Sequence, residues 1–254
     1  MNESERACLE KALQSKALRD ICPETVARVY EECLSRYKTP KEAERAARQH
    51  LHGIAGAYLS PEQMRTARKC LSEYRSGDAS ALARVLSLHA STRERTGAEA
   101  IYGRFFRGEK TVLDLACGFH PLQLGLRGLN VWGCDIHRGA VSLVNDFAEA
   151  AKLPVRAEAR DLLSDGEYPP ADAALLMKLL PLLERQKKGF PSELISRLPV
   201  RRMLVTFPSA TISGKRVGME KHYTEWFEGI VPAGWRIEDR FSVPGEICFS
   251  LSEA

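Results

Sequence analysis

The residues best placed to do chemistry are three aspartates at the ends of apolar segments. In LDLACGFHP (residues 113–121), an apolar run reaches Asp114, and the small residues up to Gly118 let the backbone pass close to a ligand. Asp135 ends VWGCD about twenty residues further on, the distance at which an acid reaches the ribose hydroxyls of a nucleotide-like cofactor. Asp161 follows PVRAEA, where such folds hold an adenine amino group. The three acids together predict recognition of an adenosyl group.

Each acid taken alone has an ordinary structural explanation. A strand-end aspartate often serves as a helix cap or belongs to a tight turn. The match around Gly118 is also imperfect, because Phe119 and His120 stand where many adenosyl-binding turns have glycine. The dinucleotide fingerprint G-x-G-x-x-G is absent, which argues against a nicotinamide cofactor.

Short apolar runs separated by plausible helices or loops would position these acids. The expected parallel strands lie at TVLDLA (111–116), VWGCDI (131–136), PVRAEA (154–159), DAALLMK (172–178) and RMLVTFP (202–208). Such alternation predicts an α/β fold with a sheet covered on both faces. The tail reads WRIEDRFSV, a Pro244-Gly245 turn and EICFSLS, which predicts an antiparallel hairpin. This arrangement resembles the Rossmann-like class I methyltransferase fold, with seven strands, rather than a dehydrogenase.

The first third of the chain is predicted to be helical. Apolar residues recur at helical spacing after Pro23, and Thr39-Pro40 and Ser60-Pro61 each begin a capping-box pattern. Gly53 and Gly56 mark a turn between those two helices. Further helices are expected over about 78–88 and 92–106.

Composition sets broad limits on the class of protein. The chain has 254 residues, 44% of them hydrophobic, without an apolar run of ~18 residues, and its charged start does not resemble a signal peptide. Seven cysteines without a C-x-x-C pair predict reduced thiols in the cytoplasm. Cys134-x-x-His137 is an isolated pair, so we expect no metal site.

Positive charge is concentrated in one region of the predicted helices. Residues 36–69 hold eight lysines and arginines against three acids, an excess larger than the net charge of +4 of the whole chain. A localised basic stripe is typical of a phosphate-binding surface. The candidate RNA-binding residues on the helices are Lys41, Arg45, Arg48, Arg65, Arg68 and Lys69. Their spacing puts them opposite Ala43, Ala46, Ala47, Met64, Ala67 and Leu71, although a merely solvated face would show the same pattern.

A second basic candidate is the segment 213–219, which reads SGKRVGM. Glycines flank Lys215 and Arg216, so the segment has the composition of a loop that moves over an RNA substrate. A flexible connection is the alternative.

Several motifs resemble the Arm/Rmt group of aminoglycoside-resistance methyltransferases, in order along nearly the whole chain. They are HGIAGAYLSPE (52–62), LHASTRER (88–95), LDLACGFHPL (113–122), VWGCDIH (131–137) and MKLLPLLERQ (177–186), followed by VTFPS, GKRVGME and WFEG. The resemblance implies methyl transfer from S-adenosylmethionine to N7 of a guanine in the decoding-site helix of 16S rRNA, within the assembled small ribosomal subunit. It also implies a helical RNA-binding domain (1–76), a helical connection that contributes to the cofactor site (77–108) and a methyltransferase domain (109–254).

By motif position, the resemblance implies a set of cofactor-binding residues. They are Tyr58, His89, Ala90, Ser91, Arg95, Gly118, Asp135, Asp161, Leu162, Met177 and Gln186. Arg95 would pair with the cofactor carboxylate in bidentate fashion, its alternative being a surface ion pair with Glu94 or Glu99. His89 has the alternative of a core histidine at a helix junction. Met177 departs from relatives, which often have Phe or Leu there.

Guanine N7 carries a lone pair and no proton, so its methylation needs no general base. We therefore expect no catalytic dyad, and the enzyme must instead align the reacting atoms and hold the base out of its stack. We also expect a cytoplasmic monomer whose partner is the small ribosomal subunit. Two alternatives stay open from the sequence: a methyltransferase of another RNA or a small molecule, and a catalytically silent RNA-binding homologue.

Overall fold

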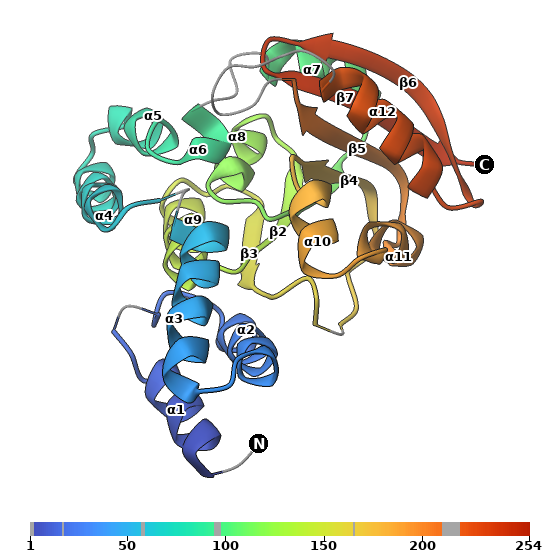
Figure 1. Ribbon diagram of the computed structural model, residues 1–254. Helices are drawn as coiled ribbons and strands as arrows, with labels where there is room; N and C mark the ends of the chain where they lie inside the picture. Colours follow the sequence, from blue (N-terminus) through green and yellow to red (C-terminus); the bar gives the residue numbers. More distant parts are fainter. Residues whose placement is uncertain (1–2, 17, 57–58, 94–97, 165, 210–218) are drawn as a thin grey trace.

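The predicted α/β fold is present in the computed structural model, which describes residues 3–16, 18–56, 59–93, 98–164, 166–209 and 219–254 (Figure 1). A single sheet has the strand order β3-β2-β1-β4-β5-β7-β6. The strands are β1 (Thr111–Leu115), β2 (Asn130–Asp135), β3 (Val155–Ala159), β4 (Ala171–Met177), β5 (Val200–Pro208), β6 (Trp235–Val243) and β7 (Glu246–Glu253). β7 runs antiparallel to β5 and β6, whereas the other neighbours are parallel, so the predicted sheet and hairpin are confirmed.

Helices cover both faces of the sheet (Figure 1). The helices that follow or flank its strands are α7 (Ala98–Phe105), α8 (His120–Leu126), α9 (Arg138–Ala150), α10 (Leu180–Gln186), α11 (Phe190–Arg197) and α12 (Met219–Ile230). α10, α11 and α12 pack on one face, and α7 and α8 pack on the other. Side chains of β1 alternate between the two faces: Leu113 packs in the core on the first face, and Val112 packs in the core on the second. A strand that is buried on both sides requires this alternation.

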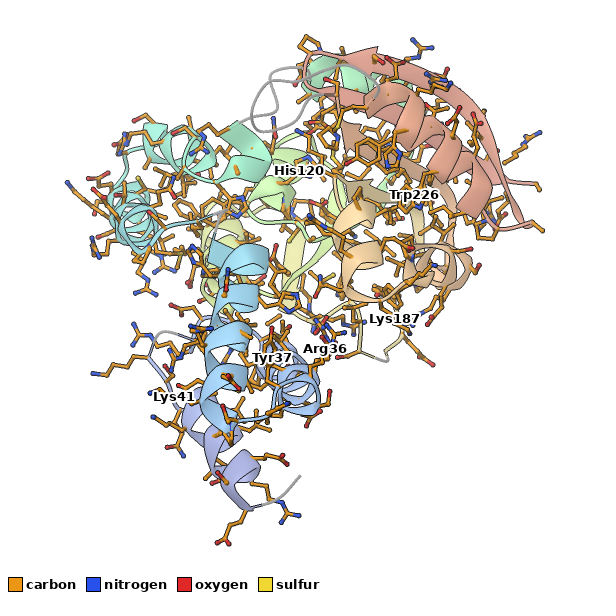
Figure 2. All side chains as sticks on the ribbon, in the orientation of Figure 1. Arg36, Tyr37, Lys41, His120, Lys187 and Trp226 are labelled. Carbon is orange, nitrogen blue, oxygen red and sulfur yellow. The ribbon has the colours of Figure 1, made fainter. Side chains whose placement is uncertain are left out.

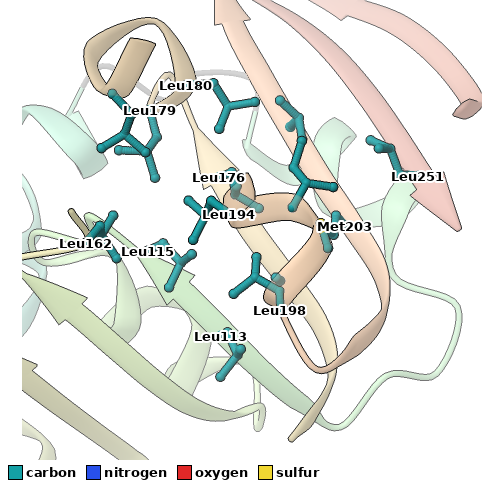
Figure 3. Packing of buried hydrophobic residues seen from close by; sticks show 14 of the residues in the cluster. Leu113, Leu115, Leu162, Leu176, Leu179, Leu180, Leu194, Leu198, Met203 and Leu251 are labelled. Carbon is teal, nitrogen blue, oxygen red and sulfur yellow. The ribbon is translucent and has the colours of Figure 1, made fainter. Parts of the chain in front are cut away.

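The largest core cluster lies under α10 and α11 (Figure 3). Leu115 of β1, Leu176 of β4 and Met203 of β5 meet Leu180 and Leu194 from the two helices. Leu162, from the loop after β3, lies at the edge of this cluster. The same packing therefore fixes the loop that carries Asp161.

The chain before β1 is helical, as predicted. Its helices are α1 (Glu3–Leu13), α2 (Pro23–Arg36), α3 (Pro40–Leu51), α4 (Pro61–Arg75), α5 (Ser80–Leu86) and α6 (Ala90–Arg93). Thr39 accepts a hydrogen bond from Glu42 N, and Ser60 and Gln63 form the full capping box. The turn predicted at Gly53 and Gly56 is a π-helical continuation of α3 over His52–Gly56.

One predicted helix includes residues that the structure does not describe. Of the helix expected over 92–106, residues 92–93 belong to α6 and residues 98–105 form α7, and residues 94–97 lie outside the described part of the chain. α6 ends at Arg93, and α7 begins at Ala98 with a buried face of Ala98, Ile101 and Phe105.

The first three helices form a cluster of their own and dock on the end of β2. Val26, Tyr30, Ala43 and Leu51 are among its buried members. Cys22 N donates to Ile136 O at 2.7 Å, and Arg138 N donates to Asp20 O at 2.7 Å. This short antiparallel bridge joins the helical region to the chain that follows Asp135. α4 and α5 instead pack against α8 and α9.

Candidate functional site

A cavity opens at the carboxyl ends of the parallel strands, where open α/β sheets bind their ligands. Its wall combines apolar side chains with a few charged groups, as is typical of sites that hold small molecules. The residues that line it are Ile54, His89, Ala90, Ala116, Asp135, Ile136, His137, Arg160, Asp161, Leu162, Met177, Lys178, Leu179, Leu182, Leu183, Gln186 and Glu246.

Most of the predicted cofactor residues meet in this cavity. Those that line it are His89, Ala90, Asp135, Asp161, Leu162, Met177 and Gln186. Tyr58 and Arg95 lie outside the described residues, and Ser91 belongs to α6 although its side chain is not described. His89 is buried and its ring contacts Phe119, with centroids 5.1 Å apart, so the cavity wall at His89 is also part of the core.

Gly118 acts through Asp135 and not as a member of the cavity wall. Its N–H donates to Asp135 Oδ2 at 2.9 Å, and His137 N donates to Asp135 Oδ1 at 2.9 Å. Ala116 and Gly118 both have left-handed backbone, with φ of 55° and 53°. That conformation costs little for glycine and more for alanine, so the turn stores some strain where it borders the cavity.

Replacing Asp135 by alanine is expected to weaken binding of the cofactor product, S-adenosylhomocysteine, by roughly 1.5–3 kcal/mol, the value of a charged hydrogen bond. Because the carboxylate also accepts two backbone N–H groups, the free energy of unfolding should fall as well. Calorimetric titration and thermal unfolding measure the two effects separately. Asp146→Ala, on α9 and away from the cavity wall, is the control. Unchanged affinity in Asp135→Ala would show that this carboxylate does not contact the ligand.

Asp161 is 4% exposed and is held from two sides. Leu163 N donates to its Oδ1 at 3.0 Å, and Arg28 Nε donates to its Oδ2 at 2.9 Å. Arg28 belongs to α2, far away in the sequence, and nothing in the spacing of residues near Asp161 indicates this partner.

The first acid of the predicted trio does not face the cavity. Asp114 is buried, and its Oδ2 pairs with His120 Nδ1 at 2.8 Å. His120 Nε2 in turn contacts the Tyr102 hydroxyl of α7. Asp114 therefore anchors α8 and α7 beneath the Ala116–Gly118 turn, and the expectation that three acids contact the adenosyl group is wrong for this one. The cause is the pleat of β1, which turns the Asp114 side chain onto the face of the sheet that α7 and α8 cover.

Lys178 and Glu246 line the cavity and were not singled out from the sequence. Lys178 follows β4 with a left-handed φ of 55°, and its Nζ lies 3.4 Å from Glu246 Oε1. Glu246 begins β7 and is 2% exposed. Thr206 of β5 accepts hydrogen bonds from Lys178 N, which fixes the strained residue. The sequence signal that could have indicated Lys178 is a lysine at the end of the otherwise apolar run DAALLMK.

The cysteines near the site are thiols and not nucleophiles. Burial raises the pKa of Cys117 and Cys134, and it raises that of Cys22 to about 12, with help from Glu24. A thiolate is the reactive form of cysteine, so thiols with raised pKa values are inert. This agrees with their predicted role as small packing residues.

A second hollow lies between α3, α4 and the segment that precedes α2. It is lined by Leu18, Arg19, Asp20, Ile21, Arg48, His52, Leu59, Ser60, Pro61, Met64, Arg65, Arg68 and His137. We call it the arginine groove. Its four arginines and two histidines face one aspartate, so it is a cationic surface suited to phosphates.

The arginine groove gathers three of the predicted RNA-binding residues, Arg48, Arg65 and Arg68. Arg48 is bound to Glu44 at 3.0 Å, whereas Arg65 and Arg68 are exposed. Lys41, Arg45 and Lys69 are exposed but do not line the groove, and Figure 2 shows Lys41 on the part of α3 that points away from the sheet. Lys215 and Arg216 lie outside the described residues.

The described part of the chain has neither a membrane-spanning helix nor a metal-binding cluster of side chains. No described helix is long and apolar enough to cross a membrane. Among the described side chains, no group of three or more His, Cys, Asp or Glu is arranged to hold a metal ion.

Comparison with known proteins assigns the family. The ribosomal RNA methyltransferase family FmrO matches residues 14–248 of this chain. The chain belongs to this family. Among FmrO-type relatives, a 16S rRNA (guanine(1405)-N(7))-methyltransferase of Serratia marcescens is 41% identical over 249 residues, covering 96% of this chain and 97% of the relative.

Solved structures agree with that assignment to FmrO. The 16S rRNA methyltransferase RmtF, crystallised in complex with S-adenosyl-L-homocysteine, superposes with a TM-score of 0.92 at 49% identity, covering all of both chains. The 16S rRNA methylase RmtB superposes with a TM-score of 0.87 at 37% identity, again over all of both chains. The resemblance to the Arm/Rmt group noted from the sequence is confirmed.

Proposed function

We propose that this protein transfers a methyl group from S-adenosylmethionine to N7 of a guanine in the decoding-site helix of 16S rRNA, and so confers resistance to 4,6-disubstituted deoxystreptamine aminoglycosides. Its target is the assembled small subunit in the cytoplasm, and it acts as a monomer. The observation that carries the proposal is the pair of carboxylates, Asp135 and Asp161, on the wall of one cavity in an FmrO-family fold.

The cavity suits this cofactor. Asp135 would bind the ribose hydroxyls, and Asp161, with Leu162, would bind the adenine ring edge. Met177, Leu179 and Leu183 supply apolar wall for the flat ring. Tyr58, His89, Ala90, Ser91 and Gln186 complete the proposed set, with Arg95 assigned to the methionine carboxylate. The bound cofactor supplies a methyl group activated by its sulfonium.

The chain's own task is alignment, because guanine N7 presents a lone pair without a proton. Holding the nucleophile in line with the methyl group removes much of the entropic barrier. The apolar side chains of the cavity also exclude water, which strengthens electrostatic interactions inside it. The left-handed turn at Ala116 brings backbone, rather than a bulky side chain, to the cavity wall.

Lys178 and Glu246 are suited to the incoming base. N7 methylation leaves a positive charge on the guanine ring, and a buried carboxylate at the cavity wall stabilises such a charge. Guanine O6 is an acceptor beside N7. The Lys178 ammonium is a donor of the right kind for O6, and its contact with Glu246 keeps both groups in place.

Replacing Glu246 by glutamine is expected to lower the rate of methyl transfer about 100-fold, the usual cost of losing one preorganised electrostatic group. Affinity for S-adenosylhomocysteine should stay unchanged, because Glu246 is assigned to the base and not to the cofactor. Single-turnover methylation and calorimetry test the two statements. Glu253→Gln, at the exposed end of the same strand, is the matched control. A full rate in Glu246→Gln would remove this carboxylate from the mechanism.

The helical region supplies the RNA surface in this proposal. Residues 1–76 form the RNA-binding domain, residues 77–108 connect it to the cofactor site, and residues 109–254 carry out the transfer. The arginine groove and the exposed Lys41, Arg45 and Lys69 would contact phosphates, which position an RNA without reading its sequence. Lys215 and Arg216 are assigned to the same RNA.

One experiment tests the function directly. The purified protein is incubated with tritiated S-adenosylmethionine and with small subunits, naked 16S rRNA or a transfer RNA mixture, and the labelled nucleotide is identified. Label at guanine N7 in the decoding-site helix of assembled subunits supports the proposal. Label in another RNA would favour the alternative substrate, and cofactor binding without any label would favour a silent homologue.

A further inference from the structure

A side chain from the predicted RNA-binding domain reaches the adenine end of the cofactor cavity. Arg28 lies in the middle of α2 and is 21% exposed. Its Nε donates to Asp161 Oδ2 at 2.9 Å, and its Nη2 donates to Gln186 Oε1 at 3.0 Å. Nη1 contacts Glu32, one turn further along the helix, at 3.4 Å. One guanidinium thus joins two cavity residues from different parts of the catalytic fold.

The contact with Arg28 fixes the orientation of the Asp161 carboxylate in the cavity. A buried carboxylate is costly without partners, and Arg28 Nε and Nη2 both lie 2.9 Å from Asp161 Oδ2. Oδ1 accepts from Leu163 N and Oδ2 accepts from Arg28, so the plane of the carboxylate is set from two sides. An ionised carboxylate has about four lone-pair positions, so acceptor capacity remains for an amino group in the cavity.

Gln186 is oriented by the same guanidinium. Its Oε1 accepts from Arg28, and its Nε2 donates to Leu182 O at 3.3 Å, within α10. An amide has a donor end and an acceptor end, and Arg28 can face only the acceptor. The helix that closes one side of the cavity is thereby tied to α2.

The docking of the helical region also reaches the ribose end. The bridges from Cys22 N to Ile136 O and from Arg138 N to Asp20 O hold the chain next to Asp135. Both carboxylates assigned to the adenosine thus lie in segments held by residues 20–28. The catalytic fold supplies both carboxylates, and residues 20–28 contact Asp161 directly and the segment that follows Asp135.

We propose that the N-terminal helical region completes the adenosine half of the cofactor pocket, with Arg28 as a positioning residue that orients Asp161 and Gln186. The inference rests on the proposed assignment of Asp161 to the adenine amino group. It makes cofactor affinity depend on a residue of the domain assigned to RNA, although Arg28 is not itself a cavity-wall residue.

Arg28→Gln tests the inference with two ligands that differ only at the adenine edge. S-adenosylhomocysteine carries the amino group, and S-inosylhomocysteine has an oxygen in its place. The unchanged protein should prefer the first by more than tenfold, because a carboxylate accepts from an amino group and repels an oxygen. Arg28→Gln should lose about tenfold in affinity for S-adenosylhomocysteine, as for one charged hydrogen bond, and little for the inosyl compound.

Matched variants separate the possible outcomes. Arg36→Gln, at the exposed end of the same helix (Figure 2), should leave both affinities unchanged. Arg28→Lys keeps the positive charge but cannot contact Asp161 and Gln186 together, so it should recover only part of the preference for S-adenosylhomocysteine. This variant also replaces Arg28→Gln in the comparison if the glutamine variant does not fold. Equal losses of affinity for both ligands in the Arg28 variants would overturn the inference, because a merely structural contact does not distinguish the two adenine-edge groups.

Asp161→Asn tests separately whether Asp161 binds the adenine amino group. If this variant and the unchanged protein both lack the preference for S-adenosylhomocysteine, the assignment of Asp161 fails rather than the role of Arg28.

Discussion

Reversing the charge of Arg65 and Arg68 together should abolish methylation of small subunits at physiological salt while leaving cofactor affinity intact. Both side chains are exposed, and both line the arginine groove. Each lost phosphate contact lowers the slope of affinity against salt by about one unit, and each introduced glutamate repels the backbone. Subunit binding measured at several salt concentrations, with calorimetry for the cofactor, checks both parts.

The control carries the same change of charge elsewhere on the molecule. Arg156→Glu with Arg236→Glu places two reversals on β3 and β6, and both side chains are exposed. This pair should keep its subunit affinity and its salt dependence if the arginine groove is the RNA surface. Near-normal methylation by the Arg65 and Arg68 variant would mean that the groove is only a solvated face. Equal loss in both variants would assign the effect to net charge.

The fold could be predicted because its signals are local and repeated. Apolar runs such as TVLDLA and DAALLMK coincide with β1 and β4, since strands buried on both faces need continuous apolar sequence. The capping pattern at Ser60 and Gln63 forms as expected because its partners are three residues apart. The helix expected over 92–106 agrees with α7 over Ala98–Phe105, where the apolar spacing matches the buried face, and residues 94–97 lie outside the described part of the chain.

The cavity at the carboxyl ends of the strands was predictable only in part, and the limit has a physical cause. Asp135 ends β2 and Asp161 lies shortly after β3, and their position at the carboxyl edge comes from the parallel topology. An aspartate at the end of a strand does not always face the cavity: the side chain of Asp114 pairs with His120 in the core. Arg28 and Glu246 reach the site from α2 and from the start of β7. Such contacts depend on how distant elements dock, and no local pattern records that.

A bacterium that expresses this protein is expected to resist one class of aminoglycosides and to stay sensitive to another. Guanine N7 is a hydrogen-bond acceptor on the major-groove edge. Methylation removes the acceptor, adds bulk and leaves a positive charge on the base. A polycationic aminoglycoside whose ring packs against that edge then meets both a steric clash and like-charge repulsion.

By the family resemblance, the drugs that pack there are linked at the 4 and 6 positions of deoxystreptamine, as kanamycin and gentamicin are. We therefore expect high resistance to these drugs and little change towards neomycin, which is linked at 4 and 5. Inhibitory concentrations for both classes, in a sensitive strain that expresses the protein, measure the difference. The Glu246→Gln variant, expressed to the same level, should return the strain to sensitivity, because the resistance requires methyl transfer and not mere binding to the ribosome. Equal resistance to both classes, or sensitivity to gentamicin despite abundant folded protein, would contradict the assigned guanine even if methylation of 16S rRNA were found.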